Sequence, residues 1–254
     1  MFLRFFHKVR LLGRRILPAL VGGMFITQSG FSQNAYLINL EQVHSRTVRK
    51  YIEKRNIDKL TDFSSIQPSW NNDINKAGFN TDERTFLFRD KISRVWENYR
   101  FSDPMKSWRG RFAKVSLLIS KGSNSVFYPG ISSRLMLDTG QVYFLSLRLL
   151  KGLFKLPVAF EIINIDPSAR MIEYSYLDDN VAKGKQTIQL FDEGDGLTKV
   201  VHTTYYKSES HFRDNVLYPY FHKKIIRDFH NKMKRLDNRE KREAISLSSN
   251  VLTQ

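Results

Sequence analysis

The chain has 254 residues with 41 Lys and Arg against 25 Asp and Glu, giving a net charge of +16, and it contains no cysteine. Without cysteine it can form no disulfide, no thiolate metal site and no cysteine nucleophile. This length is sufficient for one sizeable domain with its own core.

Residues 1–32 have the pattern of a secretory signal peptide. Residues 1–15 contain five basic side chains and no acidic one, residues 16–26 are apolar, and small polar residues follow. That apolar run is too short for an ordinary membrane-spanning helix, which needs about 20 residues. A basic start, an apolar run and a small-residue cleavage site predict export, with cleavage before Gln33 and a periplasmic or cell-envelope location. The alternatives are an uncleaved anchor or a buried amphipathic helix.

The next segment predicts a helical extension, residues 33–79, ahead of the main domain. Over residues 33–63, apolar side chains such as Val48, Tyr51 and Ile52 recur at steps near three and four, which is typical of an amphipathic helix. Residues 64–79 hold Pro68, Gly78 and a run of Asn and Asp, which favour a loop. We therefore place the main domain at residues 80–236.

The main domain is predicted to begin with a strand over residues 83–89. Asp90 can cap a helix that runs through Tyr99. Two further strands are predicted over residues 112–121 and 125–128. The run at residues 141–154 could be a buried strand or a short helix, because periodicity does not separate these two.

Four strands in series are predicted over residues 157–165, 170–177, 185–191 and 197–207. The breaks between them hold Gly, Pro, Asp and Asn, which turn a chain sharply. Connections this short join only antiparallel neighbours, so the strands form a meander. Their faces mix Tyr, Thr and His with apolar residues, which suits a sheet curved around a partly polar cavity. Alternatively, Tyr and Thr are present because of their strand propensity.

A long amphipathic helix closes the domain. Its predicted apolar stripe has steps of three and four, and Pro219 lies in its first turn or marks a kink. The stripe consists of Leu217, Phe221, Ile225, Phe229, Met233 and Leu236. Residues 237–254 are charged and then polar, and they predict a disordered tail.

This order of elements resembles the START-like (SRPBCC, Bet v 1-like) superfamily over about residues 85–236. The residues that carry the resemblance are TFLFRDKISRVWENY at 85–99, PVAFEIINIDPSARMIEYSYL at 157–177, DGLTKVVHTTYY at 195–206, and the closing helix. The resemblance implies an α+β helix-grip fold, with about six to seven antiparallel strands curved around the C-terminal helix and a cavity for an apolar ligand. The extra helical segment and the secretory start depart from the usual pattern.

Our leading functional hypothesis is a non-enzymatic carrier that holds an apolar or amphipathic, lipid-like molecule between the sheet and the C-terminal helix. The expected ligand-binding residues are Tyr174, Tyr176, His202, Thr204, Tyr206, Phe221 and Phe229. A second hypothesis, also permitted by the resemblance, is a cyclase- or dehydratase-like enzyme that uses His202 with Glu161 or Glu173 as an acid–base pair. A third is an envelope interaction protein with a filled interior.

Other chemistries have no support in the sequence. The chain contains no H-x-x-x-H or H-E-x-x-H, no G-x-G-x-x-G, no phosphate-binding loop and no G-x-S-x-G. We therefore expect no metal and no cofactor. His222 lies one residue from the apolar stripe, and a hydrogen-bonded histidine at the edge of the core is the favoured interpretation.

The C-terminal helix is strongly basic. Residues 222–242 hold nine Lys and Arg against three acidic residues. This charge could attract an anionic membrane surface, although the favoured interpretation is the solvated face of an amphipathic helix. Nucleic acid is not expected as a partner of an exported protein. The residues expected at a membrane contact are Lys223, Lys224, Arg227, Lys232, Lys234 and Arg235.

Overall fold

The computed structural model describes residues 37–70, 76–130, 135–178, 180–211 and 213–251, and in the last helix it describes side chains as far as Leu236. The described residues belong to one compact unit. The predicted signal peptide, residues 1–32, lies outside the described residues.

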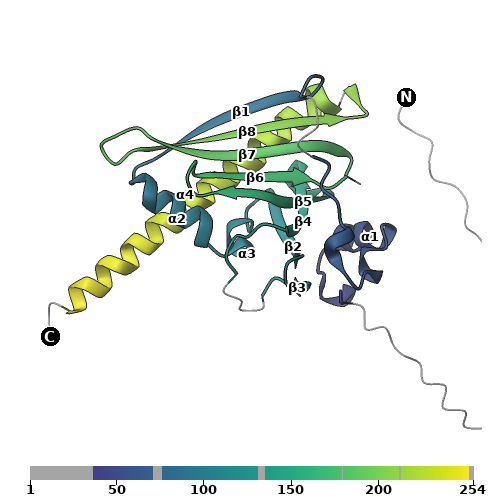
Figure 1. Cartoon of the computed structure of the whole chain (residues 1–254), viewed down its shortest axis with the longest axis horizontal. Helices are drawn as coiled ribbons and strands as arrows, with labels where there is room; N and C mark the ends of the chain where they lie inside the picture. The colour runs from purple at the N-terminus through teal and green to yellow at the C-terminus, as the bar shows by residue number, and fades with distance from the viewer. Residues whose placement is uncertain (1–36, 71–75, 131–134, 179, 212, 252–254) are drawn as a thin grey trace, which may run out of the picture. The chain divides into compact units, whose positions relative to one another are not determined.

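The described residues form one antiparallel sheet of eight strands in the order β1-β8-β7-β6-β5-β4-β2-β3. The long helix α4 (Tyr218–Val251) crosses behind this sheet (Figure 1). The α+β fold class predicted from the sequence is therefore confirmed, with eight strands in place of six to seven. The strands are β1 (Asn80–Phe88), β2 (Ala113–Ser120), β3 (Ser125–Phe127), β4 (Gln141–Leu149), β5 (Phe154–Asp166), β6 (Met171–Tyr176), β7 (Ala182–Asp192) and β8 (Thr198–Ser208).

The predicted meander corresponds to β5, β6, β7 and β8, which pair in sequence order. The ambiguous run at 141–154 is the strand β4, and seven consecutive residues of β4 from Gln141 are buried. This continuous burial arises because β4 has a core on each of its faces: Tyr143 and Leu145 face one, and Val142 and Phe144 face the other. A strand buried on both faces loses the alternation that would have identified it.

The core on the α4 side is the larger of the two. It joins the inner sheet face to α2 (Ile92–Phe101), to the short α3 (Pro104–Ser107) and to Phe229 and Met233 of α4. The predicted helix start was off by one residue. Lys91 is the N-cap of α2, and the Asp90 carboxylate accepts a hydrogen bond from the Lys91 backbone N–H.

The second core covers the opposite face of the sheet and ties residues 38–66 to β2, β4, β5 and Leu177. The continuous helix predicted over residues 33–63 is wrong for most of its length, because α1 spans only Arg46–Lys54 and short 3-10 turns flank it. Asn56, which follows shortly after α1, has the left-handed φ of 53°. Asparagine tolerates this conformation, and it ends the helical path.

The helix α4 begins after a π-helical turn, η5 (Arg213–Leu217), with Pro219 in its first turn. Its backbone is helical to Val251, so the disordered tail predicted from residue 237 is wrong over most of its length. The segment 237–251 contains no Pro or Gly to stop a helix. None of the described helices is both long enough and apolar enough to span a membrane.

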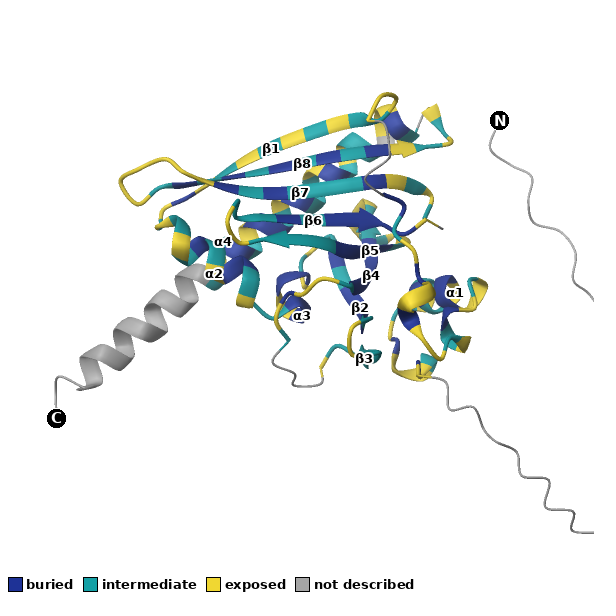
Figure 2. Ribbon diagram, in the orientation of Figure 1, coloured by how far each residue is buried: buried dark blue, intermediate teal, exposed yellow. Residues whose placement is uncertain are grey.

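The buried face of α4 differs from the predicted stripe. His222, Ile226, Phe229, His230 and Met233 are buried, whereas Phe221 is only partly buried. Figure 2 shows this burial where α4 passes behind the strands. The face of α4 that meets the sheet therefore includes two histidines, which a purely apolar stripe would have placed at its margin.

Candidate functional site

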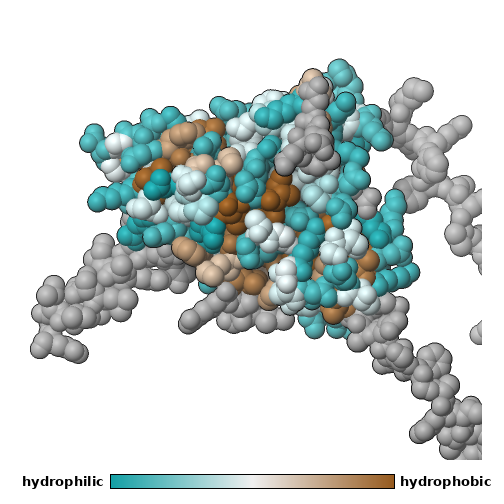
Figure 3. Space-filling view, viewed as in Figure 1, coloured by the Kyte–Doolittle hydropathy of each residue, from teal (hydrophilic) through white to brown (hydrophobic). Residues whose placement is uncertain are grey.

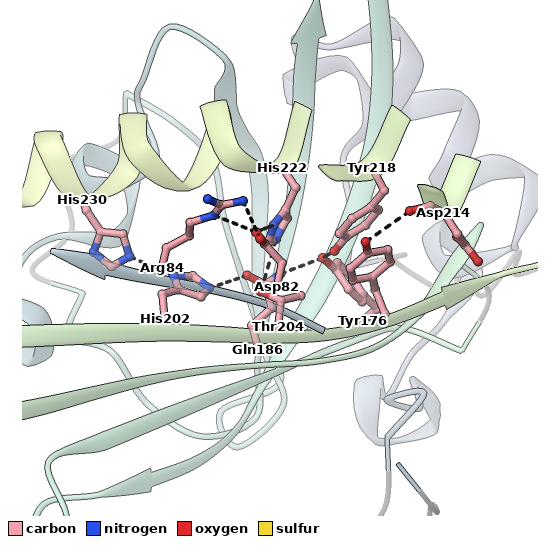
Figure 4. Close-up of polar contacts among 11 residues, drawn as sticks. Asp82, Arg84, Tyr176, Gln186, His202, Thr204, Asp214, Tyr218, His222 and His230 are labelled. Carbon is pink, nitrogen blue, oxygen red and sulfur yellow. Dashed lines mark hydrogen bonds and ion pairs between the residues drawn. The ribbon is translucent and has the colours of Figure 1, made fainter. Parts of the chain in front are cut away.

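Two histidines meet in the buried space between β8 and α4. Alternate residues of β8, from Thr198 to Tyr206, point inward and are all buried. Among them, His202 is 1% exposed and His230 of α4 is 0% exposed. The Nδ1 atom of His202 lies 2.8 Å from Nε2 of His230 (Figure 4). A direct contact between two imidazoles therefore connects the sheet to the helix.

This pair lies in the middle of a longer chain of side-chain hydrogen bonds. At one end, the Tyr99 hydroxyl of α2 lies 2.6 Å from Nδ1 of His230. On the other side, His202 Nε2 lies 2.8 Å from the Gln186 amide oxygen, and the Gln186 amide nitrogen donates to the Tyr176 hydroxyl at 2.8 Å. Tyr176 in turn bonds the Tyr218 hydroxyl at the start of α4. The chain thus connects α2, α4, β8, β7 and β6.

Both imidazoles of this chain are neutral at neutral pH. Burial lowers the pKa of His230 to about 3, with a smaller effect from the charge of Lys234. Burial, followed by the neighbouring His230 and His222, holds the pKa of His202 well below its usual value. A charged imidazole in this dry site would lose its hydration without gaining a counter-ion.

Neutrality fixes the direction of the hydrogen bonds once one of them is assigned. A neutral imidazole has one N–H donor and one acceptor nitrogen. Because the Gln186 oxygen accepts from His202 Nε2, His202 Nδ1 must accept from His230 Nε2, and His230 Nδ1 must accept from the Tyr99 hydroxyl. Reversing the Gln186 amide would reverse every donor along the chain. Two opposite polarities of one hydrogen-bonded chain are therefore compatible with the same heavy-atom positions.

A second polar group lies beside this chain. His222 of α4 contacts Thr204 Oγ1 and the Asp82 carboxylate, both at 3.3 Å, and Arg84 pairs with the same carboxylate at 2.6 Å. Burial lowers the pKa of His222, and this effect outweighs the raising effect of Asp82. Burial would by itself raise the pKa of Asp82, but hydrogen bonds from His222 and Arg84 lower it. His222 is thus a hydrogen-bonded histidine of the core, as expected from the sequence.

The start of α4 packs on the sheet through stacked rings. The ring of Tyr218 lies between Tyr206, at 3.8 Å between centroids, and His222, at 4.7 Å. Burial raises the pKa of Tyr176 to about 12, so its hydroxyl stays protonated and can donate. These stacked rings enclose the end of the hydrogen-bonded chain.

Further along α4 the same interior is apolar and aromatic. Trp108 stacks on Phe229 with centroids 4.3 Å apart and also contacts Phe160 at 5.3 Å. Phe160 stacks on Tyr143 and meets Tyr174 edge-on. The interior therefore has a hydrogen-bonding part and an aromatic part, both against α4.

Six of the seven residues predicted to bind a ligand are buried in this interior. Tyr176, His202, Thr204 and Tyr206 belong to its polar part, while Tyr174 and Phe229 belong to the aromatic part. Phe221 is the exception, because it is only partly buried.

The acid–base pair predicted between His202 and Glu161 or Glu173 is wrong. Glu161 and Glu173 lie on the opposite face of the sheet from His202. Tyr176 points toward α4, so its neighbour Ser175 points to the opposite face of the sheet. Glu161 lies directly opposite Ser175 in the β5–β6 register, and Glu173 lies two residues before Ser175, so both share the face of Ser175. Side chains alternate between faces along a strand, so neither carboxylate can reach the interior.

The two glutamates instead line a pocket of about 560 Å³ on the face opposite α4. Glu161 forms an ion pair with Lys121 at 2.7 Å, and Glu173 forms one with Lys185. Burial raises the pKa of Glu161 despite Lys121, whereas the bonds to Lys185 outweigh burial and lower the pKa of Glu173. This face of the sheet carries hydrophobic and hydrophilic side chains side by side (Figure 3). The other lining residues are Pro68, Trp70, Gly140, Ile162, Ile163 and Asn164.

Several members of the interior site were not predicted from the sequence, namely Tyr99, Gln186, His230 and Tyr218. The eight-residue spacing of His222 and His230 is a signal that could have been used, since it places both on one helix face. Within the described residues, no group of His, Asp and Glu could hold a metal ion.

Comparisons with known proteins found similarity only in structure. No protein-family model and no curated protein matches the chain. Norcoclaurine synthase from Thalictrum flavum, solved with a transition-state analogue, has 14% identity and a TM-score of 0.49, over 64% of this chain and 96% of that one. A conserved protein from Geobacillus kaustophilus has 12% identity and a TM-score of 0.44, over 63% and 96% of the two chains. A protein from Nitrosospira multiformis has 12% identity and a TM-score of 0.41, over 64% and 99%.

These likenesses are weak, and the fold is assigned from the topology itself. An antiparallel sheet begins with a strand that is followed by helices, continues through a four-strand meander, and packs one face on a long C-terminal helix. The described part of the chain has the START-like (SRPBCC, Bet v 1-like) helix-grip fold.

Proposed function

We propose that the protein is an exported, non-enzymatic binding protein that holds one amphipathic small molecule between the sheet and α4. The observation that carries this proposal is the division of one interior into two chemical parts. His202, His230 and Gln186 offer hydrogen bonds at one part, while Trp108 and Phe229 offer aromatic surface at the other. A molecule with a polar head and an apolar body matches both parts.

The contacts of the interior also suggest how such a molecule would enter. The sheet and α4 touch directly at His202 and His230 and again at Tyr176 and Tyr218. A guest must therefore move α4 away from the sheet and replace hydrogen bonds of the chain with its own polar group. The cost is limited if that group restores the partners it displaces, because only unpaired buried polar groups are expensive.

The location in the periplasm or cell envelope belongs to the same proposal and rests on the pattern of residues 1–32.

Native mass spectrometry of the exported protein, purified without detergent, tests the proposal. We expect a species heavier than the protein by one small molecule, and fragmentation would identify its class. Gln186→Leu should lower the occupied fraction because it removes a polar partner from the interior. Gln189 lies on the same strand but on the sheet face opposite α4, so Gln189→Leu should leave the occupied fraction unchanged. A protein that keeps only its own mass after incubation with an envelope lipid extract would overturn the proposal.

Acid–base catalysis in the same interior is a second candidate, favoured by the contact between two neutral imidazoles. A substrate that displaced Gln186 would free His202 Nε2 to accept its proton, and the contact with His230 would carry a proton onward. In this case turnover on a candidate substrate should fall strongly in His202→Ala. Unchanged turnover in that variant would exclude this candidate while leaving the binding proposal in place.

A further inference from the structure

The tip of the β4–β5 hairpin exposes an unusual amount of apolar surface. Leu150 is 54% exposed, Leu153 79%, Phe154 57% and Leu156 41%. Single exposed apolar side chains are common on proteins, but a contiguous group of them marks a contact surface. We refer to residues 148–156 as the apolar hairpin.

The backbone of the apolar hairpin is held in an uncommon conformation. Leu150, Lys151 and Gly152 have successive φ values of 48°, 59° and 92° in the short turn η4 (Leu150–Gly152). Two adjacent non-glycine residues with positive φ are costly, and such conformations gather at functional sites. The turn closes with a hydrogen bond from the Leu153 N–H to the Leu150 carbonyl. The strained turn therefore belongs to the segment that presents the apolar side chains.

Positive charge surrounds the exposed apolar side chains. Lys151 and Lys155 are exposed within the hairpin, and Arg148 lies directly opposite Lys155 in the β4–β5 register. Like charges in directly opposite positions destabilise a strand pair. The positive charge continues onto β2, where Arg148 above all, then burial and Arg109, lower the pKa of Lys114.

Few acidic residues are available to balance this charge. Residues 104–137 and 139–160, which include β2, β4 and the apolar hairpin, contain no Asp or Glu. Asp228 of α4 approaches this region, and its carboxylate accepts a hydrogen bond from the Phe112 backbone N–H. The hairpin therefore keeps both the repulsion between its basic side chains and its exposed apolar side chains. A partner that is both anionic and apolar would relieve both costs.

We propose that the apolar hairpin docks on an anionic lipid bilayer, with Leu153 and Phe154 entering the boundary between headgroups and acyl chains. Lys151, Lys155 and Arg148 would then contact lipid phosphates. An anionic bilayer supplies negative charge and apolar depth within a few ångströms of each other, and this combination matches the hairpin. The surface differs from the basic face of α4, and the proposal does not depend on any guest in the interior.

The absence of cysteine makes insertion directly measurable. A nitrobenzoxadiazole label on Leu153→Cys of the full chain should brighten and shift to the blue with vesicles of phosphatidylcholine and phosphatidylglycerol. It should not respond to phosphatidylcholine alone. The same label on Leu87→Cys, an apolar position on β1 that is 50% exposed, should respond to neither vesicle. An unresponsive label at 153, or equal responses at both positions, would overturn the proposal.

Co-sedimentation with the same anionic vesicles identifies which charges matter. Removing one cation near an anionic surface weakens binding about fivefold, so Lys151→Gln with Lys155→Gln should weaken binding roughly 30-fold. Lys223→Gln with Arg227→Gln, two exposed bases of α4, should leave binding within about twofold of the original protein. A loss confined to the α4 variant would move the docking surface to that helix and overturn the proposal.

A variant of the hairpin also distinguishes a membrane from other binding partners of this surface. Thermal unfolding of Leu153→Ser with Phe154→Ser checks that a loss of vesicle binding is not a loss of folding. If light scattering shows a dimer that this variant abolishes, the hairpin is an interface between two copies of the chain. If the variant abolishes binding to a single-stranded RNA without affecting vesicles, the partner is nucleic acid. Either result would overturn the membrane proposal.

Discussion

Nδ1 of His202 and Nε2 of His230 lie 2.8 Å apart between β8 and α4, with both rings buried. The helix and the sheet are thus joined by two groups that burial keeps uncharged in the folded protein, even at a pH where free histidine takes up a proton. The unfolded chain exposes both imidazoles and protonates them in mild acid, so acid favours unfolding. Stability should therefore depend on pH in a defined direction.

The first prediction concerns acid. Unfolded histidine has a pKa near 6.5, whereas the folded pKa of His230 is about 3. The unfolded chain therefore gains a proton as the pH falls below about 6.5 and the folded chain does not, so stability is lost between these two values. We expect the free energy of unfolding to fall by about 1.4 kcal/mol per pH unit for each such imidazole. Urea unfolding at a series of pH values measures this slope.

Two variants assign the slope to the buried pair. His230→Gln removes one titrating group and should flatten the fall in stability. His211→Gln changes an exposed histidine and should leave the slope as it was. A stability that stays flat from pH 7 to about pH 5 in the original protein would contradict this account of the pair.

The second prediction concerns Gln186, which connects His202 to Tyr176. Gln186→Leu leaves Nε2 of the buried His202 without a partner, whereas Tyr176 keeps its bond to Tyr218. The substitution should therefore lower the free energy of unfolding by about 1–3 kcal/mol. Gln189→Leu removes a long hydrogen bond to the Ala169 carbonyl on the other sheet face and should cost less than about 1 kcal/mol. If chemical denaturation showed the same loss in the free energy of unfolding for both variants, the chain of hydrogen bonds would make no special contribution to stability.

The third prediction concerns the aromatic part of the interior. Phe229→Ala removes the ring that stacks on Trp108, and truncating a buried Phe typically costs about 3–5 kcal/mol. Phe191→Ala removes a ring that is 38% exposed and should cost less than about 1 kcal/mol. Thermal and urea unfolding of the two variants would check this, and a mild effect of Phe229→Ala would indicate that α4 is loosely held.

The fourth prediction concerns Gly184 of β7. Its φ is +135°, and a Cβ at this position would overlap the Tyr205 carbonyl oxygen of the neighbouring strand. Gly184→Ala should therefore cost more than about 2 kcal/mol, because the backbone itself must move. Gly122→Ala has open space around the new methyl group and should be nearly neutral. The comparison of melting temperatures tests whether β7 and β8 approach as closely as described.

The fifth prediction has the opposite dependence on pH. Burial already raises the pKa of Glu161, with Lys121 opposing this effect. In Lys121→Met the pKa should rise further, so the folded protein would hold a proton that the unfolded chain releases above about pH 4.5. The loss of stability should therefore grow as the pH rises toward neutrality.

Lys183→Met provides the control for this experiment. Lys183 pairs with Asp178, and both side chains are more than half exposed. Exposed pairs contribute about 0–1 kcal/mol, so this variant should change little at any pH. A pH-independent loss in Lys121→Met would mean that the lysine acts through packing alone.

Much of the sheet could be predicted because its turns are local. Gly, Pro, Asp and Asn separate β5, β6, β7 and β8 within the sequence itself, and short turns allow only antiparallel pairing. The sequence pattern of β4 could not be distinguished from that of a helix, because β4 is buried on both faces. Whether a strand is covered once or twice depends on segments far away in the sequence, here residues 38–66.

The candidate site was less accessible to sequence reasoning. Mixed strand faces indicated a polar interior but could not show which face turns inward. In the structure, the face that turns inward carries His202 toward α4, whereas Glu161 and Glu173 lie on the opposite face of the sheet. His230 was overlooked because a histidine beside an apolar stripe has no local partner. Its partners, Tyr99 and His202, lie 131 and 28 residues away in the sequence.

The second core has a practical consequence for any attempt to isolate the helix-grip domain alone. A shortened chain that begins at residue 80, the domain boundary predicted from the sequence, would lose the cover over Leu117, Ile119, Val142 and Phe144, which are at most 1% exposed. These side chains would form an exposed apolar surface on the sheet face opposite α4, and the fragment should aggregate. The shortest fragment that can remain monodisperse begins before Ile38.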